Sequence, residues 1–237
     1  MIPLELKIDN KGILYLDKDI NKNDCIKNLE SRYCRFYNLF STNEYIIKYN
    51  LQTLSPDDII GMRDMLNKFN EVRSKIPSID FPIGYYLEDD LLRGLIIYYY
   101  NNAISLKKIF CNYSITDLFK YYAYDDNPYK NLILLYLEII SLMEELLDNK
   151  IFYLDIHGGN FVLYNNQVKL IDFEPSQLVF GTNNNILYEN VICVLKLLIN
   201  YSNSQLGLDE YINGNIDSIM KLKNEVKMLE KRLKNGI

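Results

Sequence analysis

The sequence predicts an α+β fold with two lobes: a strand-rich N-lobe with one main helix over residues 1–102, and a small, mostly helical C-lobe over residues 103–237. Three observations support this prediction. Short stretches of alternating apolar and polar residues dominate the first part. Helical periodicity dominates the second, and Asn101 and Asn102 break the pattern between them. Because 49% of the 237 residues are hydrophobic, the chain can bury a sizeable core.

Turn and capping residues indicate where elements of the N-lobe begin and end. Gly12 follows Asp9-Asn10-Lys11, which predicts a β-hairpin turn. Ser55 and Pro56 predict the start of a helix, because serine caps backbone N–H groups and proline suits the first turn. The expected elements are strands within residues 4–20 and 25–51, a helix over 55–75, and strands over 81–87 and 91–100.

The C-lobe shows mainly helical patterns. The expected elements are helices over residues 105–111, 115–124, 129–149, 188–201 and 215–234, with a strand pair over 160–164 and 167–171. The last helix has apolar residues spaced three and four apart, at Ile219, Leu222, Val226, Leu229 and Leu233. We expect this stripe to pack on its own lobe, with contact to a partner helix as the alternative.

Composition narrows the class of protein. The net charge is −5 with both signs mixed, so we expect no nucleic-acid or membrane partner. The four cysteines are scattered and there is one histidine, which predicts reduced thiols and no zinc site. The chain start lacks the pattern of a signal peptide, and no apolar stretch is long enough to span a membrane. We therefore expect a cytoplasmic protein.

Residues 153–174 give the strongest functional signal. They begin Tyr-Leu-Asp-Ile-His-Gly-Gly-Asn and end Leu-Ile-Asp-Phe-Glu, with Asn160 five residues after Asp155 and Asp172 twelve residues after Asn160. This pattern resembles the catalytic and metal-binding loops of the protein-kinase-like superfamily, which read H/Y-R-D-x-x-x-x-N and D-F-G. The alternative is a purely structural role, as a turn rich in Asp and Asn followed by a surface aspartate.

The resemblance implies a role for each residue of this segment. Asp155 would orient the acceptor hydroxyl, and Asn160 and Asp172 would hold Mg²⁺ beside ATP. His157 would either steady the γ-phosphate or cap the loop by hydrogen bonding. Gly158 and its neighbouring glycine are expected to let the loop turn tightly.

The resemblance extends more weakly into the N-lobe. Lys48, in Tyr-Ile-Ile-Lys, resembles the strand lysine that contacts the α- and β-phosphates. The expected partner of this lysine is Glu71 on the following helix, with Asp64 as the alternative. The backbone of Tyr98, Tyr99 and Tyr100 would form the hinge that binds adenine.

Three positions depart from the family pattern. The phosphate-covering loop has no glycine, so Ser31 and Arg32 would have to meet the phosphates. Leu154 replaces the usual arginine, and the short segment after Asp172 leaves little platform for a peptide. Glu174 replaces the glycine of D-F-G, which removes the freedom to adopt a positive φ.

The expected function is transfer of the ATP γ-phosphate to a hydroxyl. The phrase Ile-Phe-Tyr-Leu-Asp favours a compact, atypical Ser/Thr protein kinase. The missing platform and His157 favour the alternative of a small-molecule kinase. The departures at the glycine loop, at Leu154 and at Glu174 leave a second alternative, a catalytically inactive pseudokinase that acts as a binding module.

Overall fold

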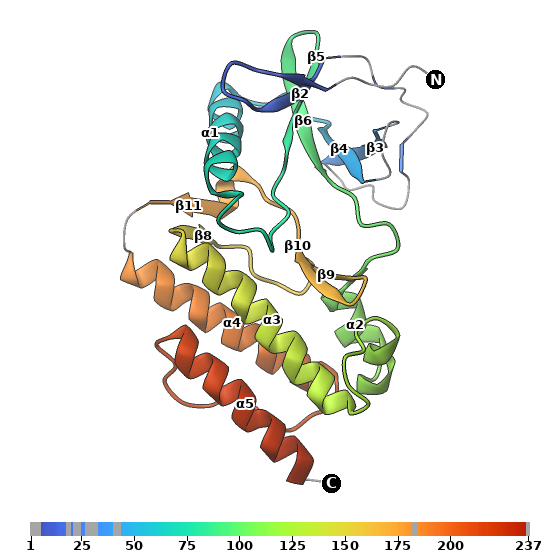
Figure 1. The fold of residues 1–237 in the computed structure, drawn as a ribbon, viewed down its shortest axis with the longest axis vertical. Helices are drawn as coiled ribbons and strands as arrows, with labels where there is room; N and C mark the ends of the chain where they lie inside the picture. Colours follow the sequence, from blue (N-terminus) through green and yellow to red (C-terminus); the bar gives the residue numbers. More distant parts are fainter. Residues whose placement is uncertain are drawn as a thin grey trace. The chain divides into compact units, whose positions relative to one another are not determined.

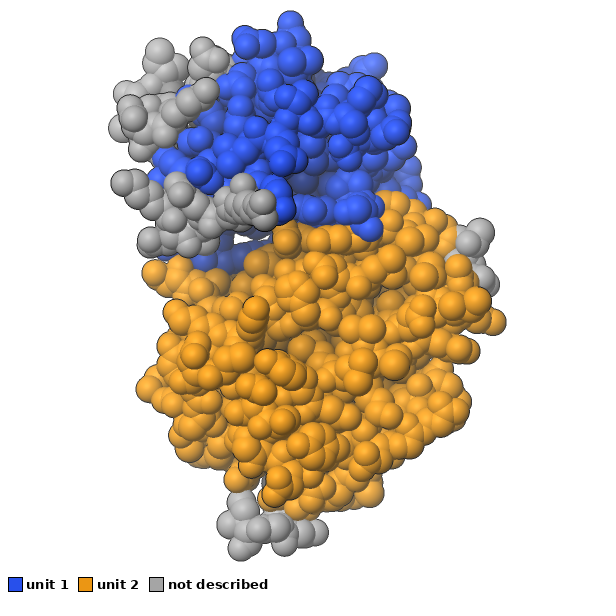
Figure 2. Space-filling view, turned by 180° about the vertical axis from the view of Figure 1, so that it is seen from behind, with its two compact units in different colours: residues 1–101, 173–176 blue, residues 102–172, 177–237 orange. Residues whose placement is uncertain are grey.

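The computed structural model describes residues 6–17, 20, 25–26, 33–39, 44–181 and 184–235. The fold is mixed α+β, as predicted (Figure 1). The chain divides into two compact units, which Figure 2 distinguishes by colour. Unit 1 contains Met1–Asn101 and Phe173–Ser176, and unit 2 contains Asn102–Asp172 and Gln177–Ile237.

The described residues of unit 1 form a six-stranded sheet with the order β1-β2-β5-β6-β4-β3. Gly12, with a φ of 79°, lies in the predicted turn between β1 and β2, and Asp89 and Asp90 adopt the positive φ of a tight hairpin between β5 and β6. The parallel pairing of β2 with β5 was not predicted. The strands are β1 (Lys7–Ile8), β2 (Leu14–Leu16), β3 (Cys34–Asn38), β4 (Tyr45–Asn50), β5 (Gly84–Glu88) and β6 (Leu91–Tyr98).

Helix α1 (Pro56–Val72) begins where the sequence predicts and ends before the expected Lys75. The side chain of Ser55 accepts a hydrogen bond from the backbone N–H of Asp58, and the Asp58 carboxylate accepts one from the backbone of Ser55. This reciprocal capping satisfies two backbone donors at the helix start. The buried face of the helix comprises Met62, Met65, Leu66, Phe69 and Val72.

In its described residues, unit 2 combines four α-helices with short strands. The 3-10 helix Ile115–Lys120 replaces the helix expected over residues 115–124, and the strands β7, β8 and β11 were not predicted. The helices are α2 (Leu106–Asn112), α3 (Pro128–Asp148), α4 (Asn185–Gln205) and α5 (Ile219–Asn235). The strands form two sheets, β10-β9-β7 and β11-β8, from β7 (Ile104–Ser105), β8 (Ile151–Tyr153), β9 (Phe161–Tyr164), β10 (Gln167–Leu170) and β11 (Leu178–Phe180).

The last helix packs on its own unit, as expected. Helix α5 lies beside α3 (Figure 1). All five apolar residues of its predicted stripe, from Ile219 to Leu233, are buried. Within the described part of the chain, no helix is both long and apolar enough to cross a membrane.

Candidate functional site

The candidate site is the loop of unit 2 that joins β8 to β9. Two backbone hydrogen bonds shape it, from Asn160 N–H to the His157 carbonyl at 3.0 Å and from Lys107 N–H to the Gly158 carbonyl at 2.7 Å. A third, from Leu154 N–H to the Gln177 carbonyl at 2.8 Å, continues the pairing of β8 with β11. The loop is therefore anchored on both sides by regular structure.

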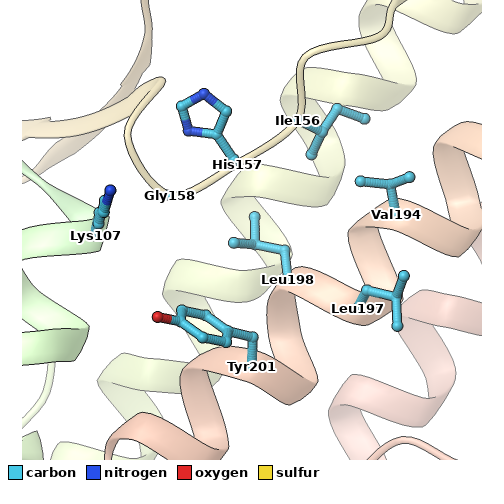
Figure 3. A pocket seen from close by; sticks show the side chains of 8 residues that line it. All are labelled: Lys107, Ile156, His157, Gly158, Val194, Leu197, Leu198 and Tyr201. Carbon is cyan, nitrogen blue, oxygen red and sulfur yellow. The ribbon is translucent and has the colours of Figure 1, made fainter.

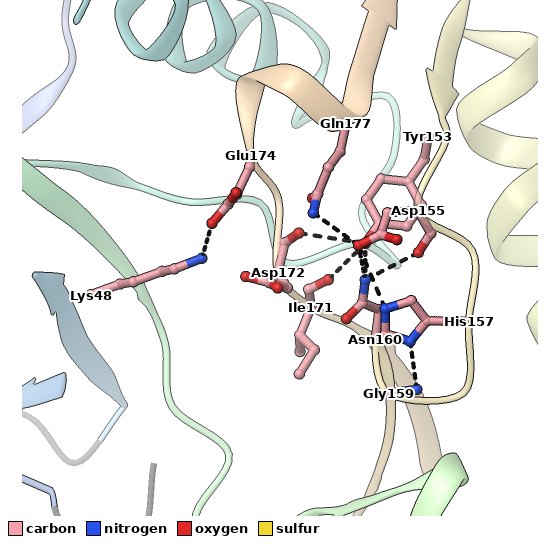
Figure 4. A network of polar contacts seen from close by, with 10 residues as sticks. All are labelled: Lys48, Tyr153, Asp155, His157, Gly159, Asn160, Ile171, Asp172, Glu174 and Gln177. Atoms are coloured by element: carbon pink, nitrogen blue, oxygen red, sulfur yellow. Dashed lines mark hydrogen bonds and ion pairs between the residues drawn. The ribbon is translucent and has the colours of Figure 1, made fainter. Parts of the chain in front are cut away.

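The carboxylate of Asp155 is held through one of its oxygens (Figure 4). Oδ2 accepts hydrogen bonds from Asn160 Nδ2 at 2.9 Å and from Gln177 Nε2 at 2.8 Å. His157 Nε2 lies 3.5 Å from the same oxygen. Among the described residues Oδ1 accepts no hydrogen bond, and the side chain is 38% exposed. One oxygen of the carboxylate is thus fixed by two side-chain amides.

Tyr153 connects the two proposed metal ligands. Its hydroxyl accepts a hydrogen bond from Asn160 Nδ2 at 2.7 Å and lies 3.3 and 3.4 Å from the carbonyl oxygens of Ile171 and Asp172. The Ile171 N–H donates to the Asn160 carbonyl at 2.9 Å, at the base of the β9–β10 hairpin. The tyrosine side chain is fully buried, so these contacts are shielded from water.

Asn160 and Asp172 suit Mg²⁺ chemically. The Asn160 amide nitrogen makes three hydrogen bonds, and within the described residues its oxygen makes none. Asp172 adopts a left-handed backbone conformation, with φ of 65°, of the kind often found at functional sites. No three His, Cys, Asp or Glu side chains form a metal cage in the described part of the chain. Mg²⁺ needs no such cage, because it usually takes one or two protein oxygens together with substrate phosphates and water.

His157 stabilises the loop. Its Nδ1 accepts a hydrogen bond from the Gly159 N–H at 2.9 Å, so the neutral ring carries its proton on Nε2, which faces Asp155. This geometry agrees with the expected capping role. A Cβ added to Gly159 would lie 2.7 Å from the His157 ring, so a larger residue there would displace the ring from this position. The absence of a side chain at Gly159 therefore leaves room for the His157 ring, whereas the sequence indicated only a tight turn.

In unit 1, the structure corrects the expected partner of Lys48. The ammonium group of Lys48 lies 2.6 Å from Glu174 Oε1. Glu71 instead pairs with Lys68 at 3.3 Å, and its side chain is 66% exposed. The expectation that Glu71 or Asp64 holds Lys48 is therefore wrong. The reason is that helix α1 turns Glu71 towards solvent, as its place opposite the apolar face requires.

The segment around Glu174 is packed firmly into unit 1. The Phe173 ring lies 5.4 Å from those of Phe69 and Phe81, which stack on each other at 4.2 Å. Pro175 approaches helix α1 so closely that a Cβ added to Gly61 would lie 3.2 Å from it. Glu174 therefore projects from a segment fixed on both sides.

The contacts of Lys48 and of the other predicted residues with a nucleotide stay predictions. Ser31 and Arg32 lie outside the described residues. Tyr98 ends β6, and the Tyr99 N–H donates to the Glu44 carbonyl at 2.7 Å. The Tyr100 hydroxyl donates to Asp80 at 2.6 Å. Tyr99 and Tyr100 thus make hydrogen bonds within unit 1 just after β6. The role of the tyrosine backbone in binding adenine stays a prediction.

A cavity of about 460 Å³ adjoins the loop within unit 2 (Figure 3). His157 and Gly158 line it from the loop, and Lys107 lines it from α2. Apolar residues of the loop and of α4 form most of the rest, namely Ile156, Val194, Leu197, Leu198 and Tyr201. His157, which lines the cavity, also lies 3.5 Å from Asp155 Oδ2, so only this side chain separates the cavity from the candidate catalytic carboxylate.

Sequence reasoning missed three residues of these networks. Tyr153 stands two residues before Asp155, so its place in the family motif was a usable signal. Glu174 had been noted only as a departure from D-F-G, although an acid at that point could have suggested an ion pair. Gln177 carries no sequence signal, because only the pairing of β8 with β11 brings it to Asp155.

Comparison of the sequence with protein-family models and with curated proteins gave no match.

Proposed function

We propose that this protein is an ATP-dependent phosphotransferase with a two-lobed, protein-kinase-like fold, which transfers the γ-phosphate to a hydroxyl acceptor. The arrangement of Asp155 carries the proposal. Asn160 and Gln177 hold one carboxylate oxygen, and the other accepts no hydrogen bond among the described residues. A carboxylate fixed in this way can orient an acceptor hydroxyl through its second oxygen.

In the proposed reaction, the acceptor oxygen forms a bond to the γ-phosphorus, and the bond from that phosphorus to the bridging oxygen breaks. ADP leaves with the electron pair. Asp155 would orient the hydroxyl and receive its proton. Asn160 and Asp172 would hold Mg²⁺, which when bound neutralises charge on the phosphate oxygens. Lys48 would contact the α- and β-phosphates.

A Ser/Thr side chain of a protein is the acceptor that the resemblance favours, and a small molecule is the second candidate. The cavity beside His157 supports the second candidate, because its volume of about 460 Å³ falls in the range of small-molecule sites. Its walls are mostly apolar, with Lys107 as a cation at the edge. An acceptor bound there would lie close to Asp155.

Two measurements test the proposed function. Thermal unfolding with Mg-ATP, compared with ATP plus a chelator, measures nucleotide binding. A ligand at about 100 times its dissociation constant adds about 2.7 kcal/mol to the free energy of unfolding, so binding should raise the Tm clearly. Incubation of a lysate with γ-labelled ATP, followed by separation of proteins from small molecules, then shows which fraction contains the acceptor.

The Asp172→Asn variant is the matched control, because it keeps the side-chain shape and removes one charge of the proposed metal site. We expect it to lose most of the Mg²⁺-dependent stabilisation and of the transfer. Absence of both stabilisation and labelled product in the parent protein would contradict the proposal. That outcome would favour a pseudokinase that acts as a binding module.

A further inference from the structure

The ion pair between Lys48 and Glu174 joins a buried lysine to a partly exposed carboxylate in unit 1. The Lys48 side chain lies on β4 and is only 9% exposed, whereas the Glu174 side chain is 39% exposed. A lysine this deeply buried keeps its charge only when hydrogen-bonding or charged partners replace its lost hydration. Glu174 provides a negative charge at 2.6 Å.

Glu174 reaches this position from a rigid segment. Phe173, immediately before it, is buried against Phe69 and Phe81, and Pro175, immediately after it, meets Gly61 of α1. The carboxylate is therefore directed towards Lys48 by packing on both sides of it. Such support is what a positioning residue requires, because it holds the partner without a large loss of side-chain entropy.

The chain also links this ion pair to Asp172. Glu174 follows Asp172 by two residues, and two residues span at most about 7 Å of chain. The anchored Glu174 therefore limits how far Asp172 can lie from this residue along the chain.

We propose that Glu174 is the positioning residue for Lys48 in nucleotide binding, in place of the helix acid that the resemblance implied. This inference rests on the proposed function. Glu174 holds the lysine ammonium at 2.6 Å and stands two residues after the proposed Mg²⁺ ligand Asp172. The third residue of the Asp-Phe-Glu motif thus has a definite role, although it departs from the family glycine.

The test compares the affinities of the full-length parent and its Glu174→Gln variant for Mg-ATP and for adenosine, by calorimetric titration. Glu174→Gln keeps the size of the side chain and removes its charge. We expect the dissociation constant for Mg-ATP to rise roughly tenfold. Adenosine lacks phosphates, so its affinity should stay within about twofold. General structural damage would weaken both ligands together.

Two further variants complete the design. Glu71→Gln removes the acid that was expected to hold Lys48, and it should bind Mg-ATP like the parent because Glu71 faces solvent. Lys48→Gln should weaken Mg-ATP binding, and adding Glu174→Gln to it should weaken binding little further, since both changes break one interaction. If Glu174→Gln does not fold, Glu174→Asp keeps the charge with a shorter reach and should bind Mg-ATP more weakly than the parent.

The possible failures can be told apart. If the parent binds Mg-ATP and Glu174→Gln binds it equally well, the inference about Glu174 is wrong and the proposed function survives. The same holds if Glu71→Gln shows the selective loss of Mg-ATP affinity instead. If the parent binds no Mg-ATP, the proposed function fails and the inference fails with it.

Discussion

Replacing Tyr153 with phenylalanine tests whether its hydroxyl organises the candidate site. The change removes one oxygen and keeps the buried ring. The Asn160 amide then loses its contact at 2.7 Å, and the carbonyls of Ile171 and Asp172 lose a donor at 3.3 and 3.4 Å. Because Tyr153 is fully buried, water cannot replace the missing hydroxyl without opening the structure.

The expected cost follows from these contacts. A buried polar group left without its partner costs roughly 1–3 kcal/mol. For a chain of this size each kcal/mol lowers the Tm by about 2–4 °C, so we expect a decrease of roughly 2–12 °C. Loss of a group that orients metal ligands typically reduces activity roughly 10–100-fold, and phosphate transfer should fall accordingly.

The assay is thermal unfolding together with transfer from γ-labelled ATP. Tyr211→Phe is the matched control, because Tyr211 is exposed and belongs to the same unit. It should leave both the Tm and the transfer unchanged. A Tyr153→Phe protein that melts within about 1 °C of the parent would refute the proposed role of this hydroxyl.

Three further predictions concern the loop, the last helix and the sheet. Gly159→Ala should displace the His157 ring and reduce transfer while far-ultraviolet circular dichroism stays that of the parent; full transfer would contradict this. Leu229→Ala should lower the free energy of unfolding by about 2–5 kcal/mol in urea, whereas the exposed Met228→Ala should change it little; equal effects would refute the packing of α5. Burial raises the pKa of Tyr45, Tyr49 and Tyr85 to about 12, above the unfolded value of about 10. The contribution of these three tyrosines to the free energy of unfolding is therefore complete below about pH 10 and is lost as the pH rises towards 12. A Tm that stays constant between about pH 10 and pH 12 would contradict the raised pKa values.

The elements that the sequence predicted well have local signals. Ser55 and Pro56 mark the start of α1, and Gly12 marks the turn between β1 and β2. The pairing of β2 with β5 has no such signal, because residues 14–16 meet residues 84–86 only after the intervening chain has folded. The same applies to the pairing of β8 with β11, which depends on the whole of unit 2.

The residues of the candidate site likewise fall into those with a local sequence signal and those that only the fold brings together. Asp155 and Asn160 lie in one loop, so their spacing in the sequence was enough to assign them to one site, although their hydrogen bond was not predicted. Lys48 and Glu174 are 126 positions apart, and no periodicity predicts their pairing. Helical periodicity placed Glu71 on α1 opposite the apolar face, and this orientation is the physical reason that it faces solvent and not Lys48. Contacts between distant segments therefore required the structure.

The most direct test of the central claim is phosphate transfer by the Asp155→Asn variant at saturating Mg-ATP. The amide keeps the size of the carboxylate but cannot accept the acceptor proton. We predict that transfer falls at least about 100-fold, the usual contribution of a general base, while Mg-ATP affinity stays within about twofold of the parent. Transfer at the parent rate in a protein with asparagine at this position would contradict the assignment of Asp155 as the group that orients the acceptor.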